Sequence, residues 1–198
     1  MIAASNHGKA MSADLHQHRF SLAQYHEMIE RGILTEDDRV ELLRGAIVSM
    51  SPIGNRHIAA VNRLTRFFVL ALGDRGVVSV QNPIATPPDS EPQPDVVILR
   101  PRDDLYDTTR PSAEATLLAV EVADSSLALD RGLKLSIYAE AGVPEYWVLD
   151  LKHDVIEVYR APEDGRYAEM HTVHRGERIA PLAFPDVVAT SDALIPTR

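Results

Sequence analysis

Apolar and polar residues alternate along this chain with two different periods, which predict helices and strands in turn. The segment Ser21-Leu22-Ala23-Gln24 has the S-x-x-Q form of a capping box, so we expect a helix from there to Arg31, before Gly32. Residues 55–72 predict a second helix that ends at Gly73. Its apolar side chains fall on one face at helical spacing, at Ile58, Val61, Leu64, Phe68 and Leu72.

Short apolar runs bounded by turn-forming residues predict the strands. These runs cover residues 40–43, 46–50, 77–80, 95–99, 117–123 and 145–149, and the stretches 155–160 and 167–173 predict hairpins around Asp164-Gly165. A further helix is expected at 129–140, between two buried strands. Strands that alternate with crossover helices predict an α/β fold with a mixed central sheet, helices on its faces and additional β-hairpins.

Composition and charge narrow the class of protein. The chain has 198 residues, of which 45% are hydrophobic and 25% charged, and this predicts a single domain over 19–198. Residues 1–18 are polar and show no periodicity, which predicts a mobile N-terminal tail. The absence of cysteine excludes disulfides, thiolate metal sites and a cysteine nucleophile. No run reaches the roughly 20 apolar residues that span a bilayer, and no apolar signal segment is present, so we expect a cytoplasmic protein without a membrane partner. The formal net charge of −9 argues against nonspecific binding of nucleic acid by charge alone.

The segment TLLAVEVADSS places a carboxylate inside a predicted strand. Residues 117–123 are apolar on both faces apart from Glu121. A carboxylate in a sheet core is costly unless it is paired, hydrogen-bonded or bound to a metal. Because side chains alternate across a strand, Glu121 shares its face with Ala119 and Ala123. These small neighbours leave room for a cleft beside the acid.

Two further charged residues are candidates to meet Glu121. Lys134 lies on the packing face of its predicted helix, where it either pairs locally with Asp130 or reaches the sheet and meets Glu121. Asp95 opens a strand directly after a proline, so it is either a turn aspartate or a second carboxylate that converges with Glu121 at one end of the sheet. Two such carboxylates would suit a hard cation, Mg²⁺ or Mn²⁺.

Pro94-Asp95, Glu121 and a lysine together resemble the PD-(D/E)-x-K phosphodiesterase superfamily. The blocks VELLRGAIVSMSP, EPQPDVVIL, LLAVEVADSSLALDRGLKLSIYAEAG and VPEYWVLDL follow one another as in one branch of it, the small restriction-endonuclease-like proteins long described as a domain of unknown function. The resemblance extends from about Phe20 to Tyr167. It implies a restriction-endonuclease-like fold and a Mg²⁺- or Mn²⁺-dependent endonuclease that hydrolyses nucleic-acid phosphodiester bonds, with DNA as the expected substrate.

The resemblance also implies roles for individual residues. Asp95 and Glu121 would hold the metal ion, and the backbone carbonyl of Val122 would complete its shell. The lysine expected two residues after the glutamate is absent, because Ala123 stands there, but in this branch the lysine moves to the following helix, as Lys134 does here. That lysine would position a metal-bound water or stabilise charge on the phosphate.

The remaining candidates have a structural alternative each. Glu41, in the early ELL-x-G block, would be an outer or second metal ligand by the resemblance, or an exposed strand residue. Gln93 could orient a water or the substrate, or is a plain loop amide. Arg56, Arg63 and Arg66 on the second helix could follow a phosphate backbone, or form a solvated charged face.

Two other classes of function stay open. The chain could be a catalytically silent relative that binds nucleic acid or a protein partner, an alternative that its net charge of −9 favours. The charged residues could also form a structural, buried ion-pair cluster. Because both acids and Lys134 are present, the metal-dependent endonuclease is preferred. The resemblance further implies a homodimer, since two sites cut two strands most simply.

Overall fold

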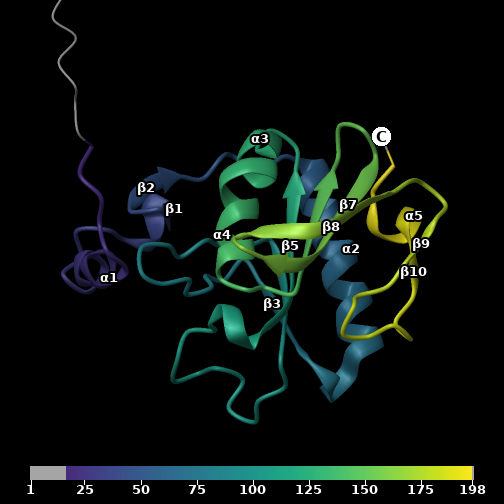
Figure 1. Ribbon diagram of the computed structural model, residues 1–198, viewed down its shortest axis with the longest axis horizontal. Coiled ribbons are helices and arrows are strands. Elements are labelled where there is room, and N and C mark those ends of the chain that lie inside the picture. Colours follow the sequence, from purple (N-terminus) through teal and green to yellow (C-terminus); the bar gives the residue numbers. More distant parts are fainter. Residues whose placement is uncertain (1–16, 198) are drawn as a thin grey trace, which may run out of the picture.

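The computed structural model describes residues 17–197, and its centre is one six-stranded sheet (Figure 1). The tail predicted for residues 1–18 lies almost entirely outside the described residues. In spatial order the strands are β3 (Val77–Val80), β4 (Val96–Leu99), β5 (Thr116–Ala123), β6 (Glu145–Asp150), β7 (Val155–Glu163) and β8 (Arg166–Val173). All neighbours are antiparallel except β5 and β6. The predicted mixed sheet is therefore confirmed, and the hairpin predicted after residue 155 extends that sheet.

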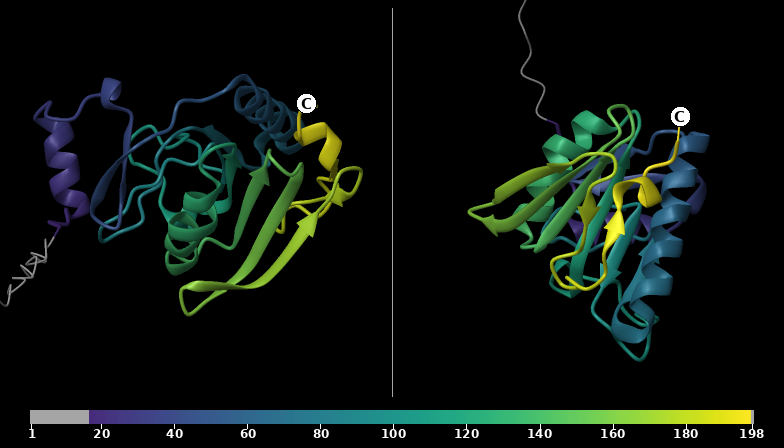
Figure 2. Two further views of the ribbon diagram at one scale, coloured as in Figure 1. Left: turned by 90° about the horizontal axis from the view of Figure 1, so that it is seen from above. Right: turned by 90° about the vertical axis from the view of Figure 1, so that its right-hand side faces the viewer.

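Helices cover both faces of the sheet, as the right-hand view of Figure 2 shows. The long helix α2 (Asn55–Leu72) packs on one face against alternate residues of β5, including Val120 and Val122. The other face carries α4 (Leu135–Glu140), which packs with Ala119 and Ala123. Burying both faces explains why β5 is apolar along its whole length apart from Glu121.

The crossover from β5 to β6 is a helix in three parts, α3 (Leu127–Leu129), the π-helical turn η4 (Asp130–Lys134) and α4. A crossover of this kind is required because β5 and β6 are parallel. The predicted helix over 129–140 is confirmed, although it begins at Leu127 and residues 130–134 of it form a π turn. Single π turns inside helices occur frequently at functional sites. Here the turn ends at Lys134, and it buries both Lys134 and Asp130 on the inner side of the helix.

The N-terminal part forms a small unit at one end of the molecule (Figure 2, left). It consists of α1 (Leu22–Glu30), the 3₁₀ turn η1 (Glu36–Asp38) and the hairpin β1 (Val40–Leu43) and β2 (Ala46–Ser49). The predicted capping box of Ser21 is present. Gly45 in the hairpin turn has φ +72°, and a Cβ there would lie 2.8 Å from the Cβ of Arg19. A larger residue would therefore push the hairpin away from the segment before α1.

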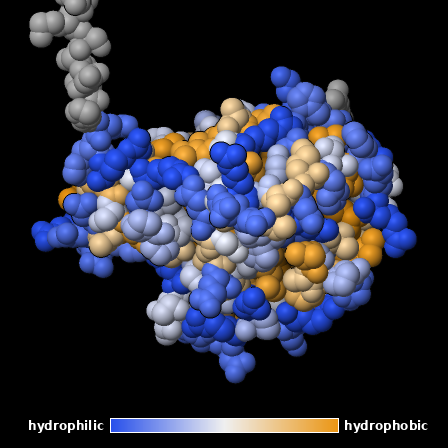
Figure 3. All heavy atoms as spheres, in the orientation of Figure 1, coloured by the Kyte–Doolittle hydropathy of each residue, from blue (hydrophilic) through white to orange (hydrophobic). Residues whose placement is uncertain are grey.

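The C-terminal segment packs beside α2, with which α5 (Ser191–Leu194) is in contact. It also forms a two-stranded sheet of β9 (Arg178–Ile179) and β10 (Ala189–Thr190). Two further 3₁₀ turns are η2 (Gly73–Arg75) and η3 (Ala113–Ala115). On the face drawn in Figure 3, hydrophobic side chains form small patches that hydrophilic ones interrupt. Among residues 17–197, no helix combines the length and apolar character needed to cross a membrane.

Candidate active site

The sheet brings the two predicted carboxylates together at the end of two neighbouring strands. Asp95 directly precedes β4, and Glu121 lies in β5. The antiparallel register pairs Val96 with Val120, so the next position along each strand places Asp95 opposite Glu121. Both carboxylates are buried. They line a pocket of about 90 Å³, together with Glu41, Asp130 and Lys134 among others.

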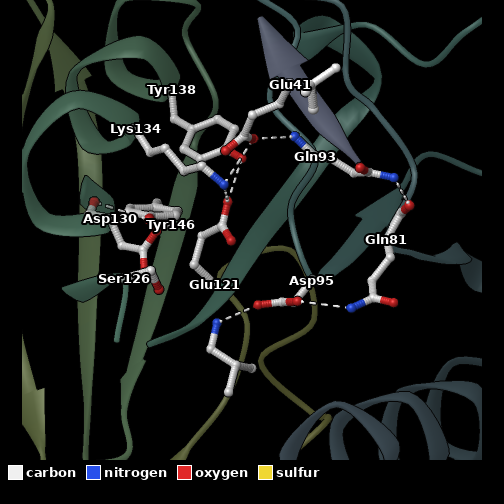
Figure 4. A network of polar contacts seen from close by, with 12 residues as sticks. Glu41, Gln81, Gln93, Asp95, Glu121, Ser126, Asp130, Lys134, Tyr138 and Tyr146 are labelled. Atoms are coloured by element: carbon white, nitrogen blue, oxygen red, sulfur yellow. Dashed lines mark hydrogen bonds and ion pairs between the residues drawn. The ribbon is translucent and has the colours of Figure 1, made fainter. Parts of the chain in front are cut away.

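Lys134 joins two of the carboxylates. Its Nζ atom lies 3.0 Å from Oε1 of Glu121 and 3.0 Å from Oε2 of Glu41 (Figure 4). The hydroxyl of Tyr138 donates a second hydrogen bond to the same Glu121 oxygen at 2.9 Å. The prediction that Lys134 reaches Glu121 is confirmed, whereas Asp130 instead accepts a hydrogen bond from Ser126 at 2.6 Å. Lys134 is thus held inside the fold by acids from a strand and a separate hairpin.

Glu41 belongs to this cluster although it lies far away in the sequence. It stands in β1, whose last three residues are buried, and only 4% of its surface is exposed. Besides Lys134, its Oε2 accepts a hydrogen bond from the backbone N–H of Gln93 at 3.0 Å. The interpretation of Glu41 as an exposed strand residue is therefore wrong. The N-terminal hairpin completes the pocket from outside the central sheet.

Asp95 is oriented by three neighbours. The backbone N–H of Val122 donates to its Oδ2 at 2.8 Å, and the side-chain amide of Gln81 donates to Oδ1 at 3.3 Å. His57 Nε2 lies 3.0 Å from the same Oδ1. Because both carboxylate oxygens are engaged, the plane of this side chain is fixed before any ligand binds. The predicted role of the Val122 carbonyl stays a prediction, since the contact observed for this residue is the hydrogen bond from its N–H to Asp95.

His57 is the site residue that sequence reasoning missed. The expected apolar face of α2 included Ile58, but Ile58 is 41% exposed and His57 is only 6% exposed. The buried face of the helix runs through Leu64, Val61 and His57, so helical spacing counted back from Leu64 would have found the histidine. Its Nδ1 atom is buried without a hydrogen-bond partner among the described residues. The N-terminal turn of α2 thereby contributes to the pocket.

The pocket holds more negative than positive charge. Burial raises the pKa of Glu121 well above its usual value, although the Lys134 ammonium opposes this, and burial also raises the pKa of Asp95. For Asp130 burial raises the pKa to about 6. Burial disfavours the charged form of Lys134, yet the charges of Glu121 and Glu41 outweigh this and raise the pKa of its ammonium. Five carboxylates line the pocket against two cations, Lys134 and Arg39, so the pocket favours protons or a further cation.

Three predicted substrate-contacting residues are used within the fold. The side-chain amide of Gln93 donates to the carbonyl oxygen of Gln81, although Gln93 does line the pocket. Arg56 donates to the carbonyls of Leu151 and Pro196 and pairs with Asp154. Arg63 contacts the Ala193 carbonyl at 3.4 Å, and neither arginine lines the pocket. Contact of these residues with a substrate stays a prediction, and the structure gives it no support for the two arginines.

Comparison with known proteins identifies the family and the fold of this chain. The sequence model of the Uma2 family, described as "Putative restriction endonuclease", matches residues 22–192. A crystal structure from Anabaena variabilis, described as "a putative nuclease belonging to DUF820", superposes with a TM-score of 0.71 at 12% sequence identity. The superposition covers 89% of this chain and 97% of the other, so the two proteins share one fold. No curated protein matches the chain. Because the family match spans most of the sequence, this chain belongs to the Uma2 family of restriction-endonuclease-like proteins.

Proposed function

We propose that this protein is a metal-dependent endonuclease that hydrolyses phosphodiester bonds in DNA. The observation that supports this most is the arrangement of Asp95, Glu121 and Lys134 in one pocket at the end of β4 and β5. Two acids and an amine at the end of a sheet are the groups that metal-assisted hydrolysis of a phosphodiester needs. Family membership and the nuclease-like fold point to the same class of reaction.

The residues present suit Mg²⁺ or Mn²⁺. Asp95 and Glu121 offer oxygen ligands, and Figure 4 shows the second oxygen of Glu121 turned toward Asp95. No described residue donates a hydrogen bond to that oxygen, and the pocket has an excess of carboxylates. Among residues 17–197, no three His, Asp or Glu side chains already surround a common position. Mg²⁺ typically binds one or two carboxylates and keeps waters and substrate phosphates as its other ligands.

Each side chain would then have one task in hydrolysis. The bound cation supplies Lewis-acid polarisation of the phosphate and a lower pKa for a bound water. Lys134 has three N–H donors, of which two point at Glu41 and Glu121, so the third is free to contact a phosphate oxygen. Glu41 keeps Lys134 in place, and His57, Gln81 and the Val122 N–H hold Asp95.

Nicking of supercoiled plasmid DNA with Mg²⁺ or Mn²⁺ tests this function. We expect the wild-type protein to cut the plasmid, and we expect Glu121→Gln and Lys134→Ala to cut it at least about 100-fold more slowly. The matched control is Glu163→Gln, which changes an exposed glutamate at the end of β7. If wild type is inert with both metals, or Glu121→Gln cuts as fast as wild type, the catalytic proposal fails.

A catalytically silent relative is the alternative that the same assay separates. It would bind DNA without cutting it, and binding would not depend on Mg²⁺. A homodimer belongs to the proposal as well, because two copies would cut the two strands of a duplex. Sedimentation of the full chain with and without DNA measures that association.

A further inference from the structure

The active-site pocket lies beside a second, larger cavity. The second cavity has a volume of about 620 Å³ and lies between α1, η1 and the loop that follows β3. Arg39, Met50, Gln81 and Gln93 line both spaces, so the two lie next to each other. We call the second, larger cavity the side groove. One of its walls comes from the N-terminal unit and the other from the segment between β3 and β4.

The two spaces differ enough in volume to hold different parts of a substrate. The active-site pocket, at about 90 Å³, has room for a cation, a few waters and one phosphoryl group. The side groove, at about 620 Å³, is within the range of roughly 300–1,000 Å³ typical of sites for drug-sized ligands. A nucleotide next to the scissile phosphate therefore fits in the side groove and not in the pocket.

Arg39 stands at the junction of the two spaces with an uncommitted guanidinium. Its side chain is exposed and makes no hydrogen bond or ion pair with another residue among 17–197. Its backbone is fixed, because it ends η1 with φ +44° and its carbonyl accepts a hydrogen bond from Met50 N–H at 2.9 Å. The nearby Asp38 carboxylate is occupied by Thr35, whose N–H donates to it at 2.6 Å. A fixed backbone carrying a free guanidinium is suited to recognising an anion.

A second arginine stands farther along the side groove. Arg110 pairs through Nη1 with Oε1 of Glu91 at 2.5 Å, and 43% of its side chain is exposed. Glu91 is only 2% exposed, and its other oxygen lies 2.7 Å from Nε2 of His26 in α1. This contact joins the two walls of the side groove. Two carboxylates line the side groove, Glu36 and Glu91, and Glu91 is already paired, so the side groove lacks the excess of acids found in the pocket.

We propose that the side groove binds the DNA strand next to the cleavage point, with Arg39 contacting the phosphate adjacent to the scissile one and Arg110 a phosphate farther away. This inference rests on the proposed endonuclease function and adds the path of the substrate strand to it. It also bears on how a chain with a net charge of −9 could bind a polyanion, because Arg39 and the partly exposed Arg110 place two cations along the side groove. Arginine suits this task since its planar guanidinium pairs with phosphate through two hydrogen bonds.

The test measures binding and cleavage of a fluorescein-labelled single-stranded oligonucleotide by the full chain. Binding is measured by anisotropy in Ca²⁺ over a range of salt, and cleavage in Mg²⁺. For Arg39→Ala we expect Kd and KM to rise about fivefold, with kcat unchanged, and the slope of log K against log[salt] to fall by about 0.7. Arg39→Lys should keep part of the affinity. Arg166→Ala is the matched control, because Arg166 is an exposed arginine at the start of β8 that lines neither space.

The outcomes separate this inference from the proposed function. If wild type cuts DNA while Arg39→Ala has wild-type Kd and salt slope, the inference is overturned and the endonuclease stands. Equal losses in Arg39→Ala and Arg166→Ala would also overturn it, because net charge alone would then explain them. If Arg39→Ala alone weakens binding but no cutting occurs, the side groove is supported and catalysis is not. If wild type neither binds nor cuts DNA, both fail.

Discussion

The ammonium of Lys134 lies 3.0 Å from Glu121, and the same nitrogen lies 3.0 Å from Glu41. This contact joins a helix, the central strand β5 and the N-terminal hairpin through one buried cation. At most 5% of each of the three side chains is exposed, so water does little to screen their charges. Removing the lysine would leave two buried carboxylates without a counter-charge.

Lys134→Met should therefore destabilise the metal-free protein strongly. Breaking a buried ion pair by removing one partner costs about 3–5 kcal/mol. We expect that loss in the free energy of urea unfolding measured in EDTA, and partial recovery when Mg²⁺ is added, because a cation bound by the folded acids stabilises the fold. Arg31→Ala, which breaks the exposed pair with Glu27, should change stability by less than about 0.5 kcal/mol. Equal stability of Lys134→Met and wild type in EDTA would contradict this interpretation.

His57 should act through Asp95 rather than on the substrate. Removing a group that orients a metal-binding carboxylate typically lowers metal affinity by about 10- to 100-fold. We expect His57→Ala to weaken Mn²⁺ binding by that factor in a titration followed by electron paramagnetic resonance, with most of kcat recovered at saturating Mn²⁺. His57→Gln, which can still donate a hydrogen bond, should retain more affinity. A folded His57→Ala protein that binds Mn²⁺ as tightly as wild type would refute this role.

Asp130 should make the metal-free protein less stable as the pH rises. Burial raises its pKa from 3.8 to about 6, so between these values the folded state binds more protons than the unfolded state. The resulting stability is present below about pH 4 and is lost as the pH rises through about 6. The full shift corresponds to roughly 3 kcal/mol. Asp130→Asn does not titrate, so its stability relative to wild type should increase by up to this amount between about pH 4 and pH 8.

Urea unfolding of both proteins in EDTA at several pH values measures this difference. Asn keeps the size of the side chain and can still accept the hydrogen bond from Ser126. The comparison therefore isolates the charge. Stability curves for wild type and Asp130→Asn that run parallel across the whole range would show that Asp130 is not the titrating group.

Much of the fold could be predicted because local patterns and tertiary packing agree in it. The alternation around Glu121 predicted small neighbours on its face, and Ala119 and Ala123 do lie there, packed with α4. The capping box at Ser21 and the helix end at Gly73 depend only on residues a few positions away in the sequence. Such signals need no knowledge of distant parts of the chain.

The features that were missed depend on distant contacts. His57 lies at helical spacing from the buried Val61 and Leu64, but its contact with Asp95 depends on where α2 meets the sheet, which the pattern of apolar residues does not record. The π turn before α4 interrupts a sequence with ordinary helical spacing. Arg56 looks like part of a charged surface in the sequence, but folding brings it to the Leu151 and Pro196 carbonyls.

The central claim is that Asp95 and Glu121 bind a divalent cation beside Lys134. Anomalous scattering from crystals of the wild-type protein soaked in Mn²⁺ tests it most directly. The account predicts one strong peak in contact with carboxylate oxygens of both residues, and its loss in crystals of Glu121→Gln. Crystals saturated with Mn²⁺ that show no peak between Asp95 and Glu121, or an equal peak in Glu121→Gln, would contradict it.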